Sequence, residues 1–196
     1  MPEFAHTLII GGTGMLREAT ITLAQRSRLL SAVSHSRNAL RDLGQALSGA
    51  PCERRLLSLD WEQSAEFVVA LQRHVAAAGP PTLVVAWLHD PDLGPVLAAA
   101  LSHPSLPCHF FQVLGSDAAD PARAAEAPPA NHGPLEYHRV VLGFQKTQGE
   151  SRWLTHAEIS AGVLEAIALG LPSHVVGAVT PWSDRPIGMP VERLQT

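Results

Sequence analysis

The chain has 196 residues, 46% of them hydrophobic, and a formal net charge of -4 at pH 7. This length suits one domain with one core, so we expect residues 1–196 to form a single domain. The weakly acidic balance, without any block of Lys or Arg, gives no electrostatic footprint for nucleic acid or an anionic membrane, so neither is expected as a partner and a small molecule is.

Short runs rich in Val, Ile and Leu alternate with longer helical stretches along the whole chain. This alternation is typical of a parallel sheet with helices on both faces, and it predicts an α/β, three-layer Rossmann fold with about seven mostly parallel strands. The predicted strands are 6–10, 30–35, 54–59, 82–88, 108–114, 138–144 and 174–179. The predicted helices are 14–27, 38–47, 61–78, 93–101 and 155–169.

A glycine-rich turn, GGTGML, joins the first predicted strand to the first helix. Glycines in this position let the backbone approach a pyrophosphate, and the amides at the helix N-terminus then meet its negative charge. We therefore predict a dinucleotide site in this turn. Its residues are Gly11, Gly12, Thr13, Gly14, Met15, Leu16 and Arg17.

Arg17 stands where such fingerprints normally carry a third glycine, which permits close packing of helix on strand. Two interpretations stay open. Either the helix stands slightly off the sheet and Arg17 extends to solvent, or its guanidinium helps to hold a phosphate.

The ends of the second and third strands bear on the choice of cofactor. The sequence SHSRN after the second strand has no acid to bond the ribose hydroxyls of NAD, whereas Ser36 and Arg37 suit the 2'-phosphate of NADP. NADP(H) is therefore favoured over NAD(H), with a solvated Arg37 as the alternative. Asp60 follows the third strand, where it is predicted either to contact adenine or to cap a helix that begins at Trp61.

The fourth strand ends in AWLHDPD, at the edge where parallel sheets bind their ligands. Trp87 and His89 are expected either to face the nicotinamide or, respectively, to fill the core and cap the next turn. Further on, 117–136 is rich in Ala and Pro and is predicted to be a loop with at most one short helix. Thr155 and Glu158 have capping-box spacing at the start of the last helix.

Five segments in this order resemble the short-chain dehydrogenase/reductase superfamily, and its atypical members more than its standard ones. They are GGTGML, the SR pair, LDW, VLGS and SRWLTHAEISAGVLEAI, and together they span nearly the whole chain. The resemblance implies a nicotinamide cofactor and a catalytic serine at the end of the fifth strand, a position that Ser116 matches. It also implies a tyrosine four residues before a lysine, in a helix that follows.

The tyrosine and lysine of this family are not both present. Tyr137 is the only tyrosine, and Val141 stands four residues after it. We interpret this as a deletion of the catalytic helix, with 117–136 as a shortened crossover. Tyr137 is then expected at the mouth of the crevice, where it would donate a proton while Ser116 polarises a carbonyl.

Two functions are compatible with these residues. One is an NADP(H)-dependent oxidoreductase that reduces a small carbonyl substrate, and the other is a catalytically inactive dinucleotide-binding sensor or regulatory protein. The ten histidines are dispersed without metal-binding spacing, so no metal site is expected.

The expected compartment follows from two weak signals. The segment MPEFAHTLII lacks a basic n-region, and Cys52 and Cys108 lie far apart without a CxxC pattern. We expect buried, reduced thiols in a cytoplasmic protein. The oligomeric state stays open, with a homo-oligomer as one alternative.

Overall fold

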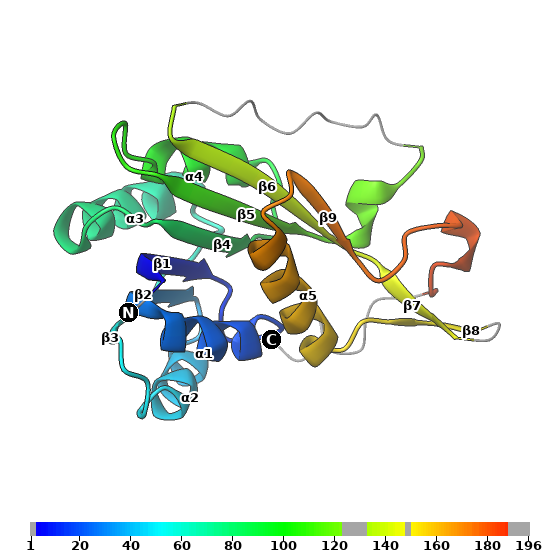
Figure 1. The fold of residues 1–196 in the computed structure, drawn as a ribbon, viewed down its shortest axis with the longest axis horizontal. Coiled ribbons are helices and arrows are strands. Elements are labelled where there is room, and N and C mark those ends of the chain that lie inside the picture. The colour runs from blue at the N-terminus through cyan, green and yellow to red at the C-terminus, as the bar shows by residue number, and fades with distance from the viewer. Residues whose placement is uncertain (1–2, 123–132, 148–149, 188–196) are drawn as a thin grey trace.

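The computed structural model describes residues 3–122, 133–147 and 150–187. Seven parallel strands form its central sheet in the order β3-β2-β1-β4-β5-β6-β9 (Figure 1). Their bounds are β1 Phe4–Ile10, β2 Ser27–Ser34, β3 Glu53–Ser58, β4 Leu83–Trp87, β5 Cys108–Leu114, β6 Leu135–Leu142 and β9 Ser173–Val176. The order in which the chain adds strands reverses between β1 and β4, which makes this place the topological switch point where such sheets bind ligands.

Helices cover both faces of the sheet, so the predicted three-layer Rossmann architecture is confirmed. One face packs against α1 (Arg17–Arg26), α2 (Arg37–Ala46) and α5 (His156–Leu169), and the other against α3 (Ser64–Ala78) and α4 (Leu93–Leu101). The alternation of buried side chains along each strand divides the core between these faces. None of the described helices combines the length and the apolar character that crossing a membrane requires.

The strand predicted at 138–144 is divided in the structure. β6 ends at Leu142, and Phe144–Thr147 (β7) turns away to pair antiparallel with Glu150–Trp153 (β8). Gly143 lies at the division, where a Cβ atom would collide with the carbonyl oxygen of Ala178. The sequence analysis missed this hairpin, because two strands of four residues are too short to show a clear alternation.

The crossover from β5 to β6 contains no α-helix among the residues that the structure describes. Ser116–Ala119 form one 3-10 turn, η1, as the prediction of a loop with one short helix allows. The end of that predicted loop was wrong, since Leu135 and Glu136 already belong to β6. Residues 123–132 lie outside the described part of the chain.

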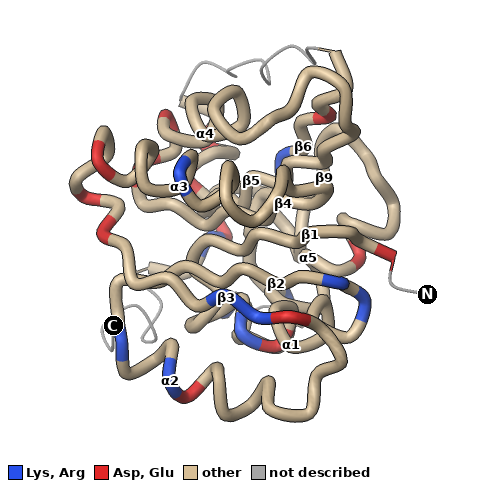
Figure 2. The backbone as a smooth tube through the Cα atoms, turned by 90° about the vertical axis from the view of Figure 1, so that its left-hand side faces the viewer, with Lys and Arg blue, Asp and Glu red and all other residues tan. Residues whose placement is uncertain are grey.

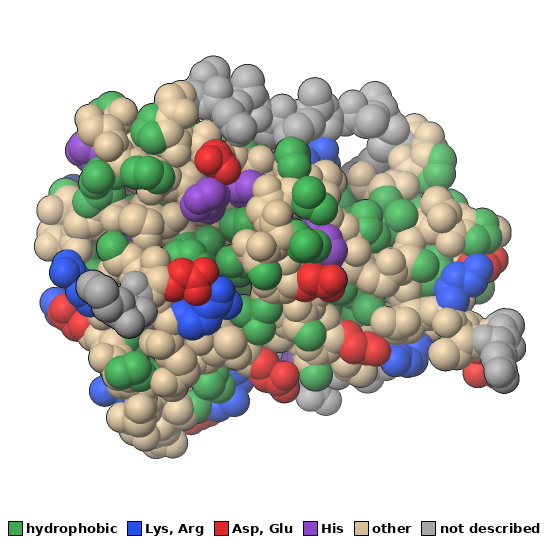
Figure 3. Space-filling model, in the orientation of Figure 1, with side chains coloured by type: hydrophobic (Ala, Val, Ile, Leu, Met, Phe, Trp, Pro, Cys, Tyr) green, Lys and Arg blue, Asp and Glu red, His purple; other side chains and the backbone are tan. Residues whose placement is uncertain are grey.

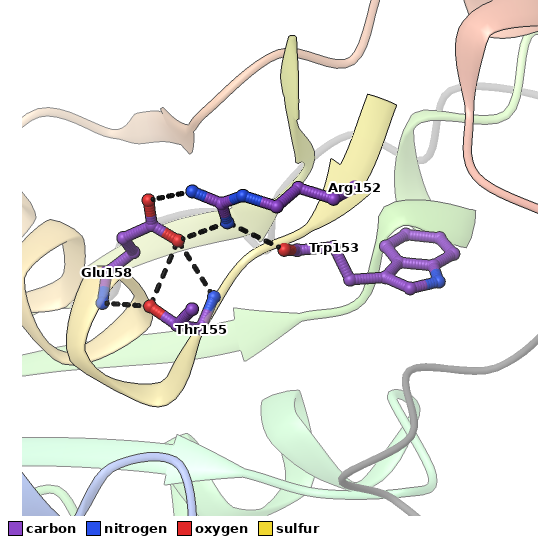
Figure 4. A network of polar contacts seen from close by, with 4 residues as sticks. All are labelled: Arg152, Trp153, Thr155 and Glu158. Atoms are coloured by element: carbon purple, nitrogen blue, oxygen red, sulfur yellow. Dashed lines mark hydrogen bonds and ion pairs between the residues drawn. The ribbon is translucent and has the colours of Figure 1, made fainter. Parts of the chain in front are cut away.

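The predicted capping box of α5 is confirmed (Figure 4). The Thr155 hydroxyl accepts the backbone N–H of Glu158 at 3.3 Å, and the Glu158 carboxylate accepts the backbone N–H of Thr155 at 2.9 Å. Arg152 on β8 also donates two hydrogen bonds of 2.8 Å to Glu158. This network fastens the β7–β8 hairpin to the start of α5.

Candidate functional site

The carboxyl ends of the parallel strands meet at one edge of the sheet, to the right in Figure 1. Five parts of the chain lie at or just after strand ends at this edge: the turn at 11–17, the segment at 34–37, Asp60, Trp87 and Ser116. The structure thus brings together every predicted site residue except Tyr137. Open α/β sheets bind their ligands in the crevice outside these strand ends.

Gly11 occupies a place that only glycine fits without strain. Its φ is 79°, its N–H donates to the carbonyl of Val33 at 3.0 Å, and an added Cβ would lie 3.1 Å from the carbonyl oxygen of Trp87. The residue is therefore enclosed by the ends of β2 and β4. Trp87 itself is half-buried and packs against the core.

The other two glycines of the turn differ from each other. An added Cβ on Gly12 would lie 2.7 Å from the hydroxyl oxygen of Thr20, whereas a Cβ on Gly14 would meet nothing within 4 Å. Gly12 is thus explained by packing inside the protein. Gly14 is not, and its open surroundings leave room for a ligand to approach the backbone.

The start of α1 leaves backbone amides without a side-chain cap. Leu16 occupies the N-cap position but is an apolar, fully buried residue. Met15 tethers the turn to α5, because its carbonyl accepts a hydrogen bond of 2.9 Å from Ser160. Arg17 is half-buried, and its backbone N–H donates to the carbonyl of Gly14 at 2.9 Å, but its guanidinium makes no hydrogen bond or ion pair with the residues that the structure describes. Uncapped amides beside a cation form a setting suited to an anion.

The end of β2 is tied to the turn by hydroxyl groups. The Ser34 hydroxyl oxygen accepts from the Thr13 hydroxyl at 3.0 Å and from the backbone N–H of Ser36 at 3.2 Å. Ser36 caps α2 by accepting the N–H of Ala39. Arg37 then begins α2 as an exposed side chain. Figure 2, which views the sheet from its opposite, amino edge, shows Lys and Arg residues on α2 and on β3.

Asp60 does not cap α3, so that alternative was wrong. The helix begins at Ser64, three residues later than a helix from Trp61 would. The exposed Asp60 carboxylate instead accepts the backbone N–H of Glu62 at 3.0 Å, which closes a local turn. Since this turn uses only one carboxylate oxygen, the other can still meet a ligand.

An aromatic group that the sequence analysis missed spans three strand ends. The ring of Trp61 stands edge-on to His35 at 4.9 Å and to His89 at 5.8 Å between ring centroids. His89 is exposed, and the turn that follows is capped by Asp90 rather than by His89. The sequence held a usable signal, because each of the three aromatic residues comes shortly after a strand end.

Ser116 lies where the resemblance places it, directly after β5, but it is already bonded within the chain. It is buried, and its hydroxyl oxygen accepts a hydrogen bond of 2.9 Å from Nε of Arg185. A second guanidinium nitrogen of Arg185 donates to Asp117 at 2.6 Å. The spacing of 69 residues between Ser116 and Arg185 gives no sequence signal for this contact.

Two tryptophans hold Arg185 in place. Its guanidinium carbon lies 5.1 Å from the ring centroid of Trp153 and 4.9 Å from that of Trp182. In Figure 4 the Trp153 ring points away from the Arg152–Glu158 pair. The segment around Arg185 is also tied to β7, because Lys146 forms an ion pair of 2.5 Å with Asp184 and lowers the pKa of that carboxyl group.

The expected position of Tyr137 at the mouth of the crevice was wrong. Tyr137 is the third residue of β6, in its amino-terminal half, and it is buried beneath α4. Its hydroxyl donates to the side-chain oxygen of Gln112 at 2.7 Å, and burial raises the pKa of the phenol further above its usual value. This position favours a role in the core.

Comparisons with known proteins bear on the fold. No family model matches the chain, and no curated sequence is similar to it. Among solved structures, a short-chain dehydrogenase/reductase from Burkholderia phymatum in complex with NAD has 14% identity and a TM-score of 0.66, over 93% of this chain and 92% of that one.

Two further solved structures agree with this likeness. Acetoin dehydrogenase from Enterobacter cloacae has 13% identity and a TM-score of 0.67, over 95% of this chain and 98% of that one. A short-chain dehydrogenase from Sphingobium yanoikuyae in complex with NADPH has 10% identity and a TM-score of 0.67, over 91% of each chain. The resemblance seen in the sequence is thus confirmed at the level of the fold.

Proposed function

We propose that the chain, which has the fold of the short-chain dehydrogenases/reductases, binds NADP(H) along the carboxyl edge of its sheet. The observation that carries this proposal is the turn at 11–17. A side chain on Gly11 would be strained, Gly14 leaves the backbone open, and the N-terminus of α1 has no side-chain cap. A pyrophosphate would meet backbone amides there, with the guanidinium of Arg17 beside them.

The choice of NADP(H) depends on Arg37. Its exposed side chain begins α2 directly beside the end of β2, and it makes no hydrogen bond or ion pair within the described residues. A guanidinium can donate two hydrogen bonds to the charged 2'-phosphate of NADP. The neutral 2'-hydroxyl of NAD does not need such a cation. The ring of Trp61, held at the same edge by His35 and His89, offers a surface for the adenine.

We infer that the bound dinucleotide serves sensing or regulation. The Ser116 hydroxyl accepts a hydrogen bond from Arg185, whose guanidinium lies near the rings of two tryptophans. Tyr137 is buried in the amino-terminal half of β6. The side chains beyond the end of β5 therefore contact one another: Ser116 with Arg185, and Arg185 with the two tryptophans. A protein of this kind would respond to the level of NADP(H) without consuming it.

Reduction of a small carbonyl is the second candidate, favoured by the position of Ser116. With Arg185 donating to its oxygen, the Ser116 hydroxyl still has its own proton to donate to a carbonyl oxygen. Bound NADPH would supply the hydride. A proton donor other than Tyr137 would then be required.

The cofactor assignment is tested by calorimetric titration with NADPH and NADH. We expect wild type to prefer NADPH, and Arg37→Glu to weaken NADPH binding by about 100-fold, because an attractive charge is replaced by a repulsive one. Arg41→Glu is the matched control, since Arg41 is also exposed on α2 and, among the described residues, its side chain hydrogen-bonds only Asn38. Equal losses in the two variants would contradict a specific 2'-phosphate contact.

A panel of aldehydes and ketones, followed by the absorbance of NADPH, separates the two functions. We expect no turnover that depends on Ser116. Turnover that Ser116→Ala abolishes, with NADPH affinity unchanged, would establish the reductase and contradict the regulatory function.

A further inference from the structure

Three ligand-type side chains lie together at the amino ends of β5 and β6, at the edge of the sheet opposite the dinucleotide site. His109 is the second residue of β5, and Glu136 and His138 lie two apart on β6, so that they share one face. His109 is paired in register with Glu136 and therefore lies beside both β6 residues. Figure 3 shows histidine side chains next to an acidic side chain over these strand starts.

The ligand atoms of these residues converge. Nδ1 of His109 lies 3.3 Å from Nε2 of His138 and 3.4 Å from a carboxylate oxygen of Glu136. That oxygen is 4.0 Å from Nε2 of His138. All three atoms lie within 4.8 Å of one another, which is close enough to surround one ion.

These separations match a tetrahedral zinc site. Zn²⁺ binds histidine nitrogen at about 2.0–2.1 Å and carboxylate oxygen at a similar distance, so two tetrahedral ligand atoms lie roughly 3.3–3.4 Å apart. Two of the three separations meet this value. The third requires only that Glu136 rotate slightly, and its side chain is free to do so because it is 56% exposed.

His138 is oriented as a metal ligand requires. Its Nδ1 lies 2.9 Å from the carbonyl oxygen of Leu171, and because a carbonyl can only accept, Nδ1 carries the proton. Its Nε2 is therefore left with a lone pair directed at His109. The ring is buried and stacks on Phe111 at 4.2 Å between centroids, which fixes its plane.

We propose that His109, Glu136 and His138 form a binding site for one divalent transition-metal ion, with Zn²⁺ as the best fit. The partial exposure of His109 and Glu136 admits the ion from solvent and leaves the fourth coordination position to water. The ion would join β5 to β6 and, through Leu171, to the segment between α5 and β9. The sequence analysis expected no metal, because ligands from two strands show no local spacing.

The competing interpretation is a hydrogen bond without a metal, in which Nδ1–H of His109 donates to Nε2 of His138. The two are separated by titrating untagged protein with ZnCl₂ in a calorimeter and with CoCl₂ in a spectrometer, since tetrahedral Co²⁺ absorbs visible light far more strongly than the hydrated octahedral ion. We expect one ion per chain, a Co²⁺ spectrum of the tetrahedral type, and a higher melting temperature with Zn²⁺.

Variants of the two exposed ligands test the assignment without disturbing the buried ring. We expect His109→Ala to weaken Zn²⁺ binding by about 100-fold and Glu136→Gln by about tenfold, with the fold checked by circular dichroism. His174→Ala is the matched control, because His174 has a carboxylate partner, Glu165 at 3.9 Å, but belongs to no three-ligand group among the residues that the structure describes. No stoichiometric binding in wild type, or equal binding in all three variants, would overturn the proposal.

Discussion

The carboxyl edge of the sheet has two halves that differ in how their polar groups are used. In the half formed by the ends of β1, β2 and β4, the side chains of Arg17 and Arg37 have no partner among the described residues, and Gly14 leaves the backbone open. In the half beyond β5, Ser116 is bonded to Arg185. The first half thus leaves polar groups open to a ligand. In the second half, the serine that dehydrogenase chemistry would use is hydrogen-bonded within the chain.

The glycines of the first half offer the largest expected effect. Gly11→Ala should destabilise the fold by about 2 kcal/mol, because a left-handed φ and a close carbonyl both oppose the new methyl group. Gly14→Ala should leave stability within about 0.5 kcal/mol, because the added methyl meets nothing. Urea unfolding of the two variants measures this contrast.

The Gly14→Ala variant, although stable, should bind the ligand less tightly. If a pyrophosphate lies against its backbone, Gly14→Ala should weaken NADPH binding by about tenfold while the protein stays folded. Unchanged affinity in this variant would show that the ligand does not approach the turn at Gly14.

The second half offers a smaller, pH-dependent effect. Hydrogen bonds from Arg152 and Thr155 lower the pKa of Glu158 from 4.5 to about 2. Since the pKa is lower in the folded protein, this stabilisation is present above pH 4.5 and is lost as the pH falls towards 2. We expect a loss of only about 1 kcal/mol, because the pair is exposed.

Unfolding curves between neutral and acidic pH measure this contribution. Glu158→Gln should lose the part of the acid sensitivity that the Arg152 pair supplies, whereas Glu165→Gln on the same helix should keep it. The same pH profile in both variants would contradict the assignment of this titration to Glu158.

The sequence predicted those parts of the molecule that depend on neighbours in the chain. Short runs rich in Val, Ile and Leu located all seven strands of the sheet, though not all of their bounds, and the spacing of Thr155 and Glu158 identified the start of α5. The glycine turn was placed correctly for the same reason, because strand, turn and helix follow one another directly.

Contacts between distant segments could not be predicted in this way. The bond from Arg185 to Ser116 and the meeting of His109 with His138 join separate elements, with no spacing to reveal them. Tyr137 differs, since a residue at the start of a parallel strand lies at the amino edge, away from the crevice. The direction of the predicted parallel strand already placed Tyr137 at the amino edge and not at the mouth of the crevice.

The central claim is that recognition of NADP(H) depends on the first half of the edge alone. Calorimetric titration of wild type with NADPH and with 2'-phospho-ADP-ribose, which lacks the nicotinamide ring, tests it most directly. We expect the two affinities to agree within about threefold, since the second half bonds to itself. NADPH binding about 100-fold more tightly than the analogue, or no heat with either ligand, would contradict the claim.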